Sequence, residues 1–317
     1  MSAAGTTRVV VTGGAGFIGA NLCRALTDAG VDEVIAFDDL STGSKANLAG
    51  TGATLVEASI LDPAALADAL AGATSVVHLA ARPSVPRSIA DPVASHDANA
   101  TGTVNVLEAA RATGVGHVVV ASSSSVYGAN PTLPKSEDLC TMPVSPYAAS
   151  KLATESYALA WQRSFGLGVL AFRFFNVFGP LQPAGHAYAA VVPAFVDAAL
   201  AGRPLPVHGD GTQTRDFTFV GTVAAVLARA ATGRIAHDGP VNLAFGSRVS
   251  LLELISRLEA ILGHPVERDH QPTRAGDVRD SQADDTVLRS LFPDVVPVPL
   301  DDGLRATLEW FRAEAGR

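Results

Sequence analysis

The chain has 317 residues, 48% of them hydrophobic and only 17% charged, which is enough apolar sequence for a large core in one or two domains. A formal net charge of -8 argues against nucleic-acid binding through a broad basic surface. Two cysteines and scattered histidines argue against a disulfide scaffold or a metal site, and no apolar run is long enough to span a membrane. We therefore expect a cytoplasmic protein whose partners include neither nucleic acid nor membrane.

The N-terminal part predicts a strand, a glycine-rich turn and a helix. An apolar run at residues 8–12 precedes the turn, and a helical stretch at residues 20–29 follows it. The glycines of the turn are Gly13, Gly14, Gly16 and Gly19. Glycines let the backbone approach a pyrophosphate, and the N-terminus of the following helix favours negative charge. This order of elements predicts a dinucleotide-binding turn.

A second apolar run at residues 33–37 ends in Asp38. A carboxylate at this point accepts hydrogen bonds from the adenosine ribose 2′-hydroxyl and repels a 2′-phosphate. We therefore expect NAD rather than NADP. Two further runs, at residues 75–80 and 117–121, predict more strands; His78 lies inside the first of them and is expected to be a packed core residue. Strands that alternate with helices predict an α/β fold, a Rossmann-like doubly wound parallel sheet.

Four consecutive serines at residues 122–125 follow the last of these strands, where site residues of an open parallel sheet gather. Tyr147 and Lys151 come next, at a spacing that puts both on one face of a helix. A nearby ammonium favours the phenolate and lowers a tyrosine pKa from its usual value near ~10. With a serine hydroxyl the pair completes a proton-transfer site. On these two residues alone, a solvated helix face is an equal alternative.

Pro and Gly become frequent from about residue 176, which predicts a change of architecture. We place an NAD-binding domain at residues 1–175 and a smaller α/β C-terminal substrate-binding region at residues 176–317. A later segment near residues 217–233 is expected to return to the first domain. The helical stretches at residues 95–113 and 147–165 carry apolar residues at helical spacing, so both pack on the sheet or on a partner.

These motifs together resemble the extended short-chain dehydrogenase/reductase family, and more narrowly its UDP-sugar 4-epimerases, from about residue 9 to residue 311. The motifs that carry the resemblance lie at residues 12–19, 78–81, 122–128, 145–151, 173–180, 209–217 and 276–279. The resemblance implies 4-epimerisation of a UDP-hexose through a transient 4-keto sugar, with NAD regenerated. It also implies a homodimer, in which the stretches at 95–113 and 147–165 form a four-helix interface.

The resemblance implies three catalytic residues: Tyr147 is the base, Lys151 tunes it and binds the nicotinamide ribose, and Ser123 hydrogen-bonds the reacting oxygen. The implied NAD-binding residues are Gly13, Gly16, Phe17, Ile18, Gly19, Asp38, Leu79, Ala80 and Lys151. The implied substrate-binding residues are Ser84, Ser124, Ser125, Asn176, Val191, Val207, Arg215, Arg274, Asp277 and Ser281. Among these, the arginines resemble diphosphate ligands and Asp277 the partner of the uridine ribose. Ser59 and Asp62 stand where the family often carries the acidic adenine contact, so that contact is left unassigned.

Several alternatives share this site. Nucleotide-sugar dehydratases normally carry an acidic pair where this chain has Ser124 and Ser125. UDP-glucuronate 4-epimerases tend to carry Thr in place of Asn176 and Arg in place of Pro183. A net dehydrogenase would use the same residues and release NADH, whereas a non-enzymatic NAD-binding scaffold need not keep them.

Sugar choice has one candidate determinant. In glucose-restricted epimerases a bulky Tyr occupies the position of Ser281, and a small residue leaves room for a 2-N-acetyl group. The segments at residues 84–88 and 188–193 also resemble epimerases of N-acetylated UDP-hexoses. We therefore expect turnover of UDP-GlcNAc and UDP-GalNAc as well as UDP-Glc and UDP-Gal; the alternative is that Ser281 is a small surface residue. Arg279 is either a further cation for the nucleotide or a surface residue.

Overall fold

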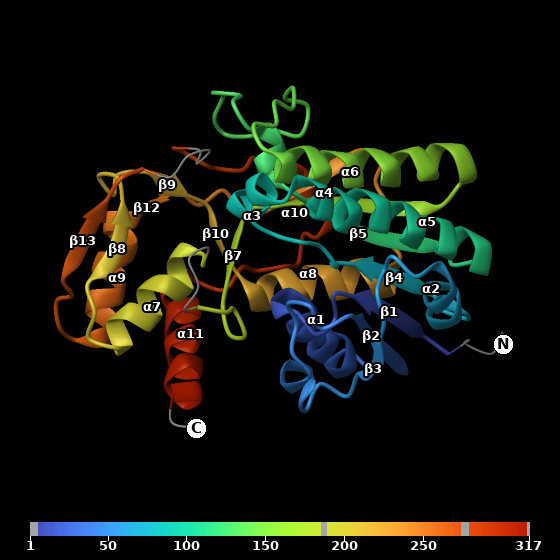
Figure 1. The fold of residues 1–317 in the computed structure, drawn as a ribbon, viewed down its shortest axis with the longest axis horizontal. Helices are drawn as coiled ribbons and strands as arrows, with labels where there is room; N and C mark the ends of the chain where they lie inside the picture. Colours follow the sequence, from blue (N-terminus) through green and yellow to red (C-terminus); the bar gives the residue numbers. More distant parts are fainter. Residues whose placement is uncertain (1–5, 185–188, 274–278, 316–317) are drawn as a thin grey trace.

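The computed structural model describes residues 6–184, 189–273 and 279–315, which form a large body and a smaller lobe (Figure 1). The body is built on one seven-stranded parallel sheet with the order β11-β6-β5-β4-β1-β2-β3. Its strands are β1 (Arg8–Thr12), β2 (Glu33–Asp38), β3 (Thr54–Glu57), β4 (Ser75–His78), β5 (His117–Ser123), β6 (Gly168–Phe174) and β11 (Pro240–Leu243). The predicted Rossmann-like sheet is confirmed.

The strand order creates a crevice beside β1. From β1 the chain adds β2 and β3 on one side, and then returns to add β4, β5 and β6 on the other. In an open parallel sheet, ligands bind at such a switch point, outside the carboxyl ends of the strands. The sheet therefore places its site between β1 and β4.

Helices cover both faces of the sheet. One face carries α1 (Phe17–Asp28), α8 (Val220–Gly233) and α10 (Thr286–Leu291). The other carries α2 (Pro63–Leu70), α5 (Gly102–Thr113) and α6 (Pro146–Phe165). Short helical segments complete this part of the chain: Lys45–Leu48, α3 (Val85–Ala90), α4 (Pro92–His96), the π-turn Asp97–Thr101 and the 3-10 turn Ser124–Tyr127.

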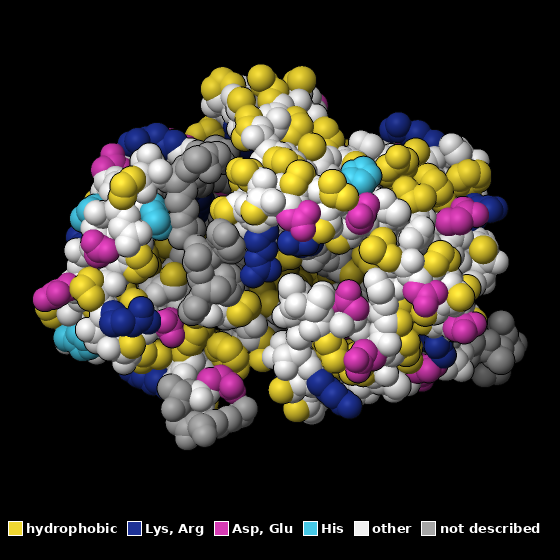
Figure 2. Space-filling model, in the orientation of Figure 1, with side chains coloured by type: hydrophobic (Ala, Val, Ile, Leu, Met, Phe, Trp, Pro, Cys, Tyr) yellow, Lys and Arg dark blue, Asp and Glu magenta, His cyan; other side chains and the backbone are white. Residues whose placement is uncertain are grey.

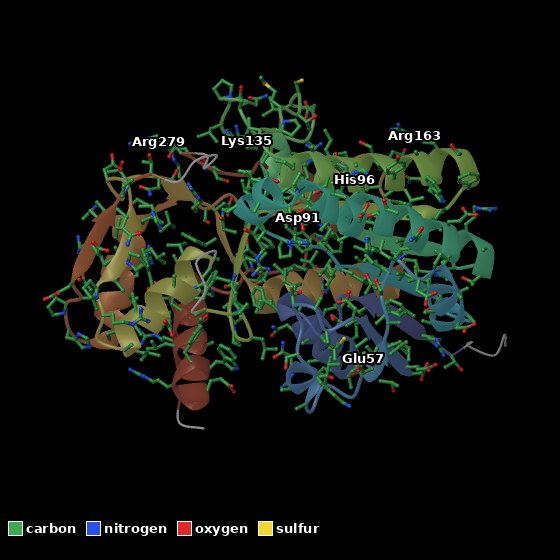
Figure 3. All side chains as sticks on the ribbon, viewed as in Figure 1. Glu57, Asp91, His96, Lys135, Arg163 and Arg279 are labelled. Carbon is green, nitrogen blue, oxygen red and sulfur yellow. The ribbon has the colours of Figure 1, made fainter. Side chains whose placement is uncertain are left out.

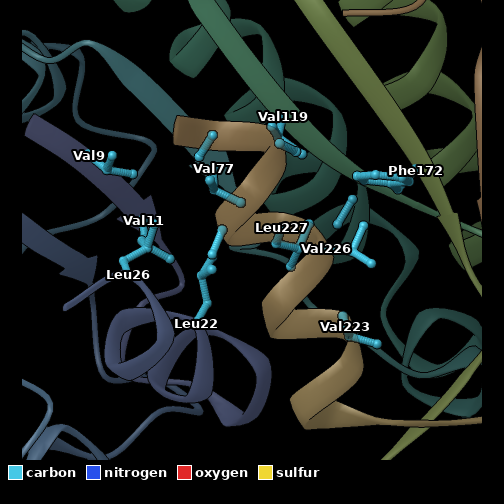
Figure 4. Close-up of a cluster of buried hydrophobic side chains, with 14 of the residues drawn as sticks. Val9, Val11, Leu22, Leu26, Val77, Val119, Phe172, Val223, Val226 and Leu227 are labelled. Atoms are coloured by element: carbon cyan, nitrogen blue, oxygen red, sulfur yellow. The ribbon is translucent and has the colours of Figure 1, made fainter. Parts of the chain in front are cut away.

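The valine-rich strands are hydrophobic on both faces because both faces are covered. Val9 and Val11 of β1 point toward α1 and α8, whereas Val10 points to the opposite core. Figure 4 shows the first of these cores, where Leu22 and Leu26 of α1 meet the strand valines. Burial of apolar surface on both faces stabilises the parallel sheet, whose strand order places the carboxyl ends at the crevice.

The smaller lobe has its own core, formed by α7, α9 and α11 around short strands. Its helices are α7 (Val191–Leu200), α9 (Leu251–Leu262) and α11 (Leu300–Ala315). Its strands, together with β7, form two-stranded pairs: β7 (Asn176–Phe178) with β10 (Phe217–Phe219), β8 (Leu205–His208) with β13 (Arg268–Gln271), and β9 (Thr214–Arg215) with β12 (Val249–Ser250).

The chain passes between the two parts more often than the sequence indicates. Only the segment near residues 217–233 was predicted to return to the first domain, and α8 in that segment does lie on the large sheet. The structure adds β11, which pairs with β6, and α10, whose Leu288 packs in the same core. A single boundary at residue 175 therefore does not divide the chain into two continuous parts. The return of β11 to the large sheet was not predicted because a four-residue strand carries too little sequence pattern to be recognised.

Within the described ranges, no helix combines the length and the apolar character that a membrane crossing requires. The same residues contain no cluster of three or more His, Cys, Asp or Glu side chains that could hold a metal ion.

Candidate active site

A cavity of about 970 Å³ lies along the carboxyl ends of the central strands. Every predicted NAD-binding residue lines it: Gly13, Gly16, Phe17, Ile18, Gly19, Asp38, Leu79, Ala80 and Lys151. Ser123 and Tyr147 line it as well. The residues predicted for the cofactor and for proton transfer thus share one space. Figure 2 shows Lys and Arg side chains near the centre of this face, on the side of the body that looks toward the smaller lobe.

The glycine turn leaves no room for side chains. Gly13 has φ +70, and a Cβ added there would lie 2.7 Å from the Ala80 backbone nitrogen. A Cβ on Gly19 would lie 2.0 Å from the Gly13 carbonyl oxygen, so α1 begins in direct contact with the turn. The first residues of α1 line the cavity and bring the positive end of the helix to it. The turn fits a pyrophosphate.

Asp38 ends β2 with its carboxylate held by backbone amides. Its Oδ2 accepts a hydrogen bond from Ala15 N at 2.9 Å, and its Oδ1 accepts one from Leu40 N at 2.8 Å. Burial raises the pKa of Asp38, and these two hydrogen bonds act against the rise. The carboxylate is therefore fixed at the cavity wall in the place that suits a ribose hydroxyl.

The adenosine end of the cavity is lined by small and apolar residues rather than by an acid from the β3 turn. Ala58, Ser59, Ile60 and Leu61 line it. Asp62 does not, because its carboxylate caps α2 and accepts hydrogen bonds from Ala64 N and Ala65 N. Ser59 rather than Asp62 thus stands at this wall.

Tyr147 lies in the first turn of α6. Ser145 caps this helix by accepting from Ala148 N at 3.1 Å, and Ser88 of α3 accepts from Tyr147 N at 3.0 Å. Ser123 stands at the end of β5, where its Oγ accepts a hydrogen bond from Ser125 Oγ at 2.9 Å. A hydrogen bond between Ser123 and Tyr147 acts to lower the tyrosine pKa. The two proposed proton-transfer groups therefore face each other.

The expected lowering of the Tyr147 pKa by Lys151 is wrong for the protein alone. Burial dominates and raises the pKa of Tyr147, and Ser123 rather than Lys151 is the group that opposes the rise. Lys151 Nζ donates instead to the Ala121 carbonyl oxygen at 2.7 Å. Burial lowers the pKa of Lys151 to about 8. Helical spacing indicated the shared face, but the balance between burial and charge depends on the tertiary structure.

His78 is a packed core residue, as predicted. It is buried, and its ring nitrogens lie 2.7 Å from Thr12 Oγ1 and 3.1 Å from Thr103 Oγ1. Burial, with a smaller effect from the Lys151 charge, lowers the pKa of His78 to about 3. The imidazole is therefore neutral at physiological pH and supports β4 beside the site.

A second cavity of about 340 Å³ lies toward the smaller lobe. Of the predicted substrate residues, Asn176, Val191 and Arg215 line it. Asn176 Nδ2 donates to the Asp216 carbonyl oxygen at 3.4 Å, and Arg215 Nη1 donates to the Thr214 carbonyl oxygen at 2.9 Å. These contacts orient an amide and a guanidinium toward a space that adjoins the cofactor cavity.

Val207 does not contribute a side chain to this second cavity. It is fully buried in the core of the smaller lobe, because β8 alternates and only Pro206 and His208 face the cavity. Its side chain therefore cannot face the substrate, and a contact through its backbone stays a prediction. Arg279 also points elsewhere: its Nη2 donates to Thr212 Oγ1 at 2.8 Å, and Figure 3 places it at the outer edge beside β9.

Four predicted serines lie near the two cavities but do not line either one. Ser84 caps α3 with an unusual φ of 99, and Ser124 and Ser125 form the turn just after Ser123. Ser281 is half-buried, and its backbone nitrogen donates to the Thr214 carbonyl oxygen at 3.1 Å, directly beside Arg215. Arg274 and Asp277 lie outside the described residues.

Sequence reasoning missed the residues that join the two cavities. Phe175, Val177 and Gln182 line both of them. Gln182 Nε2 donates to the Val177 carbonyl oxygen at 3.1 Å, but its buried Oε1 has no hydrogen-bond partner within the described chain. A buried acceptor without a partner is costly, so this atom fits a donor supplied by a ligand. A polar residue just after the motif at 173–180 was the available signal.

Comparison with known proteins agrees with this geometry. Residues 9–244 match the model of the NAD dependent epimerase/dehydratase family. A UDP-glucose 4-epimerase of Mycolicibacterium smegmatis is 40% identical over 312 residues, which cover 96% of this chain and 98% of the relative. The predicted resemblance and the predicted cofactor, NAD, are confirmed at the level of the family.

Two solved structures have the same architecture. A UDP-N-acetylglucosamine 4-epimerase from Methanobrevibacter ruminantium, in complex with UDP-N-acetylmuramic acid, has a TM-score of 0.91 and 34% identity over 97% of this chain and 99% of that one. A dTDP-glucose 4,6-dehydratase from Streptomyces venezuelae with NAD bound has a TM-score of 0.89 and 33% identity over 98% of each chain. The chain therefore belongs to the NAD dependent epimerase/dehydratase family, as an NAD-dependent enzyme of the UDP-sugar 4-epimerase type.

Proposed function

We propose that the protein interconverts the C4 epimers of UDP-hexoses, including N-acetylated ones, with NAD retained and regenerated. The observation that carries the proposal is the position of Tyr147 and Ser123. Both line the cofactor cavity, which shares three residues with the cavity that holds Arg215. A sugar at that junction would have its reacting carbon beside Tyr147 and its diphosphate beside Arg215.

NAD supplies the acceptor and later the donor of the hydride at C4. Tyr147 Oη takes the proton of the 4-hydroxyl and returns it, and Ser123 Oγ holds the same oxygen by a hydrogen bond. Because burial raises the Tyr147 pKa in the protein alone, the phenolate requires positive charge nearby. The oxidised nicotinamide would supply that charge when bound. Lys151, one helical turn from Tyr147, would bind the ribose of the cofactor.

The acids of the cofactor cavity support epimerisation over dehydration. The only carboxylates among its described lining residues are Asp38 and Asp39, which lie at the end of β2. Dehydration moves protons at two further sugar carbons and needs an acid at the catalytic end. Ser124 and Ser125 cannot act as that acid at neutral pH. A neutral hexose is also favoured over a glucuronate, because Asn176 and Pro183 supply no cation.

The substrate we propose includes a 2-N-acetyl group for two reasons. Ser281 is small and lies beside Arg215, where a Tyr would narrow the approach to the second cavity. Gln182 offers an unpaired oxygen at the junction, which can accept a hydrogen bond from an amide N–H or a hydroxyl. Arg274 and Asp277 complete the proposed nucleotide site.

We also propose a cytoplasmic homodimer. On α6, Tyr157 is 42% and Phe165 is 54% exposed, although large aromatic side chains are usually covered. Trp161 stacks edge-on against both, with ring centroids 6.1 and 5.4 Å apart. A second copy would cover this row together with α5. Light scattering on the wild type and on Phe165→Asp tests this: loss of the dimer in the variant supports it, and a wild-type monomer refutes it.

The experiment that tests the function compares UDP-N-acetylglucosamine with UDP-glucose, with products separated by chromatography and NADH followed by absorbance. We expect both 4-epimers without accumulation of NADH. Ser281→Tyr should lower turnover of the N-acetylated sugar by at least tenfold and spare UDP-glucose, and Ser281→Ala is the matched control. Intact N-acetylglucosamine turnover in Ser281→Tyr would overturn the sugar assignment, and accumulating NADH would overturn the reaction.

A further inference from the structure

A buried ion pair lies directly behind the catalytic wall. Glu155 of α6 and Arg173 of β6 have side chains that are 5% and 4% exposed. Arg173 Nη2 donates to Glu155 Oε1 at 2.7 Å, and its Nε donates to Oε2 at 2.9 Å. This two-point geometry is the strongest that an Arg and a carboxylate can form. Neither residue lines either cavity, so the pair does not contact the substrate or the cofactor.

The pair connects the elements that carry the proposed catalytic residues. Tyr147, Lys151 and Glu155 follow one another at four-residue intervals and so share one face of α6. Ser122 Oγ donates to Glu155 Oε2 at 2.9 Å, one residue before Ser123. Across the sheet, Ser122 is in register with Arg173. Glu155 thus connects the end of β5, which carries Ser123, and the end of β6 to α6, the helix that carries Tyr147.

Arg173 makes further contacts on its other side. Its guanidinium lies over the Tyr127 ring at 4.7 Å, and its Nη1 donates to the Glu137 carbonyl oxygen at 3.1 Å. Burial alone would lower the pKa of Arg173, but the hydrogen bonds and charge of Glu155 raise it above its ordinary value. The guanidinium therefore keeps its charge, and the pair as a whole is neutral.

We propose that Glu155 and Arg173 are positioning residues for the proposed base Tyr147, holding α6 in register with Ser123 while they cancel each other's charge behind the site. This inference rests on the proposed role of Tyr147. Loss of one member would leave the other buried and unpaired, at a fixed distance from the reacting tyrosine. On this proposal the site requires that the Glu155–Arg173 pair has no net charge, and not only that its side chains fill the space behind Tyr147.

The size of the effect follows from helix geometry. Eight residues separate Glu155 from Tyr147, which is roughly 12 Å along the helix axis. A unit charge at that distance in a protein interior shifts a pKa by about one unit. Glu155→Gln leaves a net positive charge and moves the acid limb of the pH–rate profile about one pH unit lower. Arg173→Gln leaves a net negative charge and moves it upward by a similar amount.

The test measures kcat against pH for the wild type, Glu155→Gln, Arg173→Gln, the double variant and Arg173→Lys. Tyrosinate absorbance of each NAD-loaded protein, taken as the difference from its own Tyr147→Phe version, reports the titration without turnover. Far-ultraviolet circular dichroism checks folding, and the neutral double variant remains a usable protein if a single variant does not fold. We expect opposite shifts in the single variants and a limb near the wild-type position in the double variant.

The pH limb separates charge from packing because other charges are constant among the variants. Apart from Arg173 itself on β6, the titratable or charged side chains on elements that pack against α6 are Arg87 on α3, His96 on α4, Asp97 in the π-turn, Glu108 and Arg111 on α5, Tyr127 in the 3-10 turn and His117 on β5. Four further titratable or charged side chains lie close to Tyr147 or to the ion pair: His78, Arg82, Glu137 and Lys151. Arg173→Lys keeps the charge but not the two-point geometry, so it should lower kcat at least fivefold with the limb unmoved.

Each outcome decides a separate question. If the acid limb of the pH–rate profile stays at the wild-type position in both single variants, and only the rate or the stability falls, the inference is overturned and the pair has a structural role alone. A double variant displaced as far as a single one would also overturn it. Retained turnover in Tyr147→Phe would instead overturn the proposed function. Opposite optical and kinetic shifts that cancel in the double variant would establish that the two charges compensate each other. A lower kcat in Arg173→Lys with the limb unmoved would establish the positioning role, and an unchanged kcat in that variant would overturn it.

Discussion

Replacing Lys151 by Met should make the difference in stability between variant and wild type depend on pH in a defined window. The Lys151 side chain is buried, and its Nζ donates to the Ala121 carbonyl oxygen. Across residues 6–184, 189–273 and 279–315, no Asp or Glu forms an ion pair with it. The folded protein therefore holds a buried ammonium whose charge is not compensated by a carboxylate.

The magnitude follows from the shift that burial causes. Burial lowers the pKa of Lys151 from its ordinary 10.5 to about 8. At about 1.4 kcal/mol for each unit, the charged lysine costs the folded state roughly 3 kcal/mol. Below pH 8 both states bind the proton, so the full cost is present. Between pH 8 and 10.5 the unfolded chain keeps a proton that the folded protein has released, so the wild type gains stability as pH rises.

The assay is urea unfolding of NAD-free wild type and Lys151→Met at pH 7, 8, 9 and 10. Met also leaves the Ala121 carbonyl without its partner, which costs about 1–3 kcal/mol at every pH. The test is therefore how the difference in unfolding free energy between variant and wild type changes with pH, and not the sign of that difference at pH 7. We expect the stability of the variant relative to the wild type to fall by about 2.5 kcal/mol between pH 7 and pH 10, most of the full cost of the buried charge. Lys45→Met, at an exposed lysine, is the matched control and should give a flat difference.

A relative stability of Lys151→Met that stays constant, or rises, across this range would refute the reasoning. It would mean that the lysine is hydrated or compensated in solution. A loss of activity in the same variant, with NAD binding weakened, is expected in either case. If the stability difference does change with pH as expected, Lys151 is a residue that lowers the stability of the fold in exchange for its function.

Three further predictions follow from the cavities. Gly13→Ala should abolish NAD retention on gel filtration, because its Cβ would lie 2.7 Å from Ala80 N at φ +70; retained NAD would contradict the tight turn. Gln182→Met should leave the free protein within about 1 kcal/mol of wild-type stability but weaken substrate binding about tenfold by calorimetry, because only the ligand satisfies Oε1; unchanged affinity would contradict this. Asp38→Ser should raise the affinity for NADP relative to NAD at least tenfold by fluorescence titration, and an unchanged ratio would show that the carboxylate does not select the cofactor.

Features set by local sequence were predicted well. The glycine turn and Asp38 lie within 26 residues of each other along the chain, and backbone sterics tie them directly to a strand, a turn and a helix. Their arrangement around one cavity follows from strand order, which the alternation of strands and helices already indicated. Asp62 also had a readable local signal, since an acid followed by Pro63 is typical of a helix N-cap.

Features that depend on tertiary burial were not predictable in the same way. The Tyr147 pKa rises because the folded chain surrounds the ring, and sequence spacing cannot weigh that against the Lys151 charge. Gln182 is notable only because one of its atoms has no partner in the fold. The ion pair of Glu155 and Arg173 joins a helix to a strand 18 positions away. Arg173 opens the motif at residues 173–180, but nothing in the sequence paired it with Glu155.

The proposed role of Ser281 depends both on local sequence and on tertiary structure. Its size was readable from the sequence, but its place beside Arg215 depends on the bridge between Thr214 and Asp280. Val207 shows the reverse case, in which a strand position was predicted for the site and alternation turned the side chain into the core.

The measurement that tests the central claim most directly uses UDP-N-acetylglucosamine carrying deuterium at C4. The products are resolved by chromatography and mass spectrometry while NADH is followed by absorbance. We expect the 4-epimer with deuterium retained at C4, no NADH accumulation and no product after Tyr147→Phe. Loss of the deuterium to solvent, a dehydrated product, or stoichiometric NADH would contradict the proposed function.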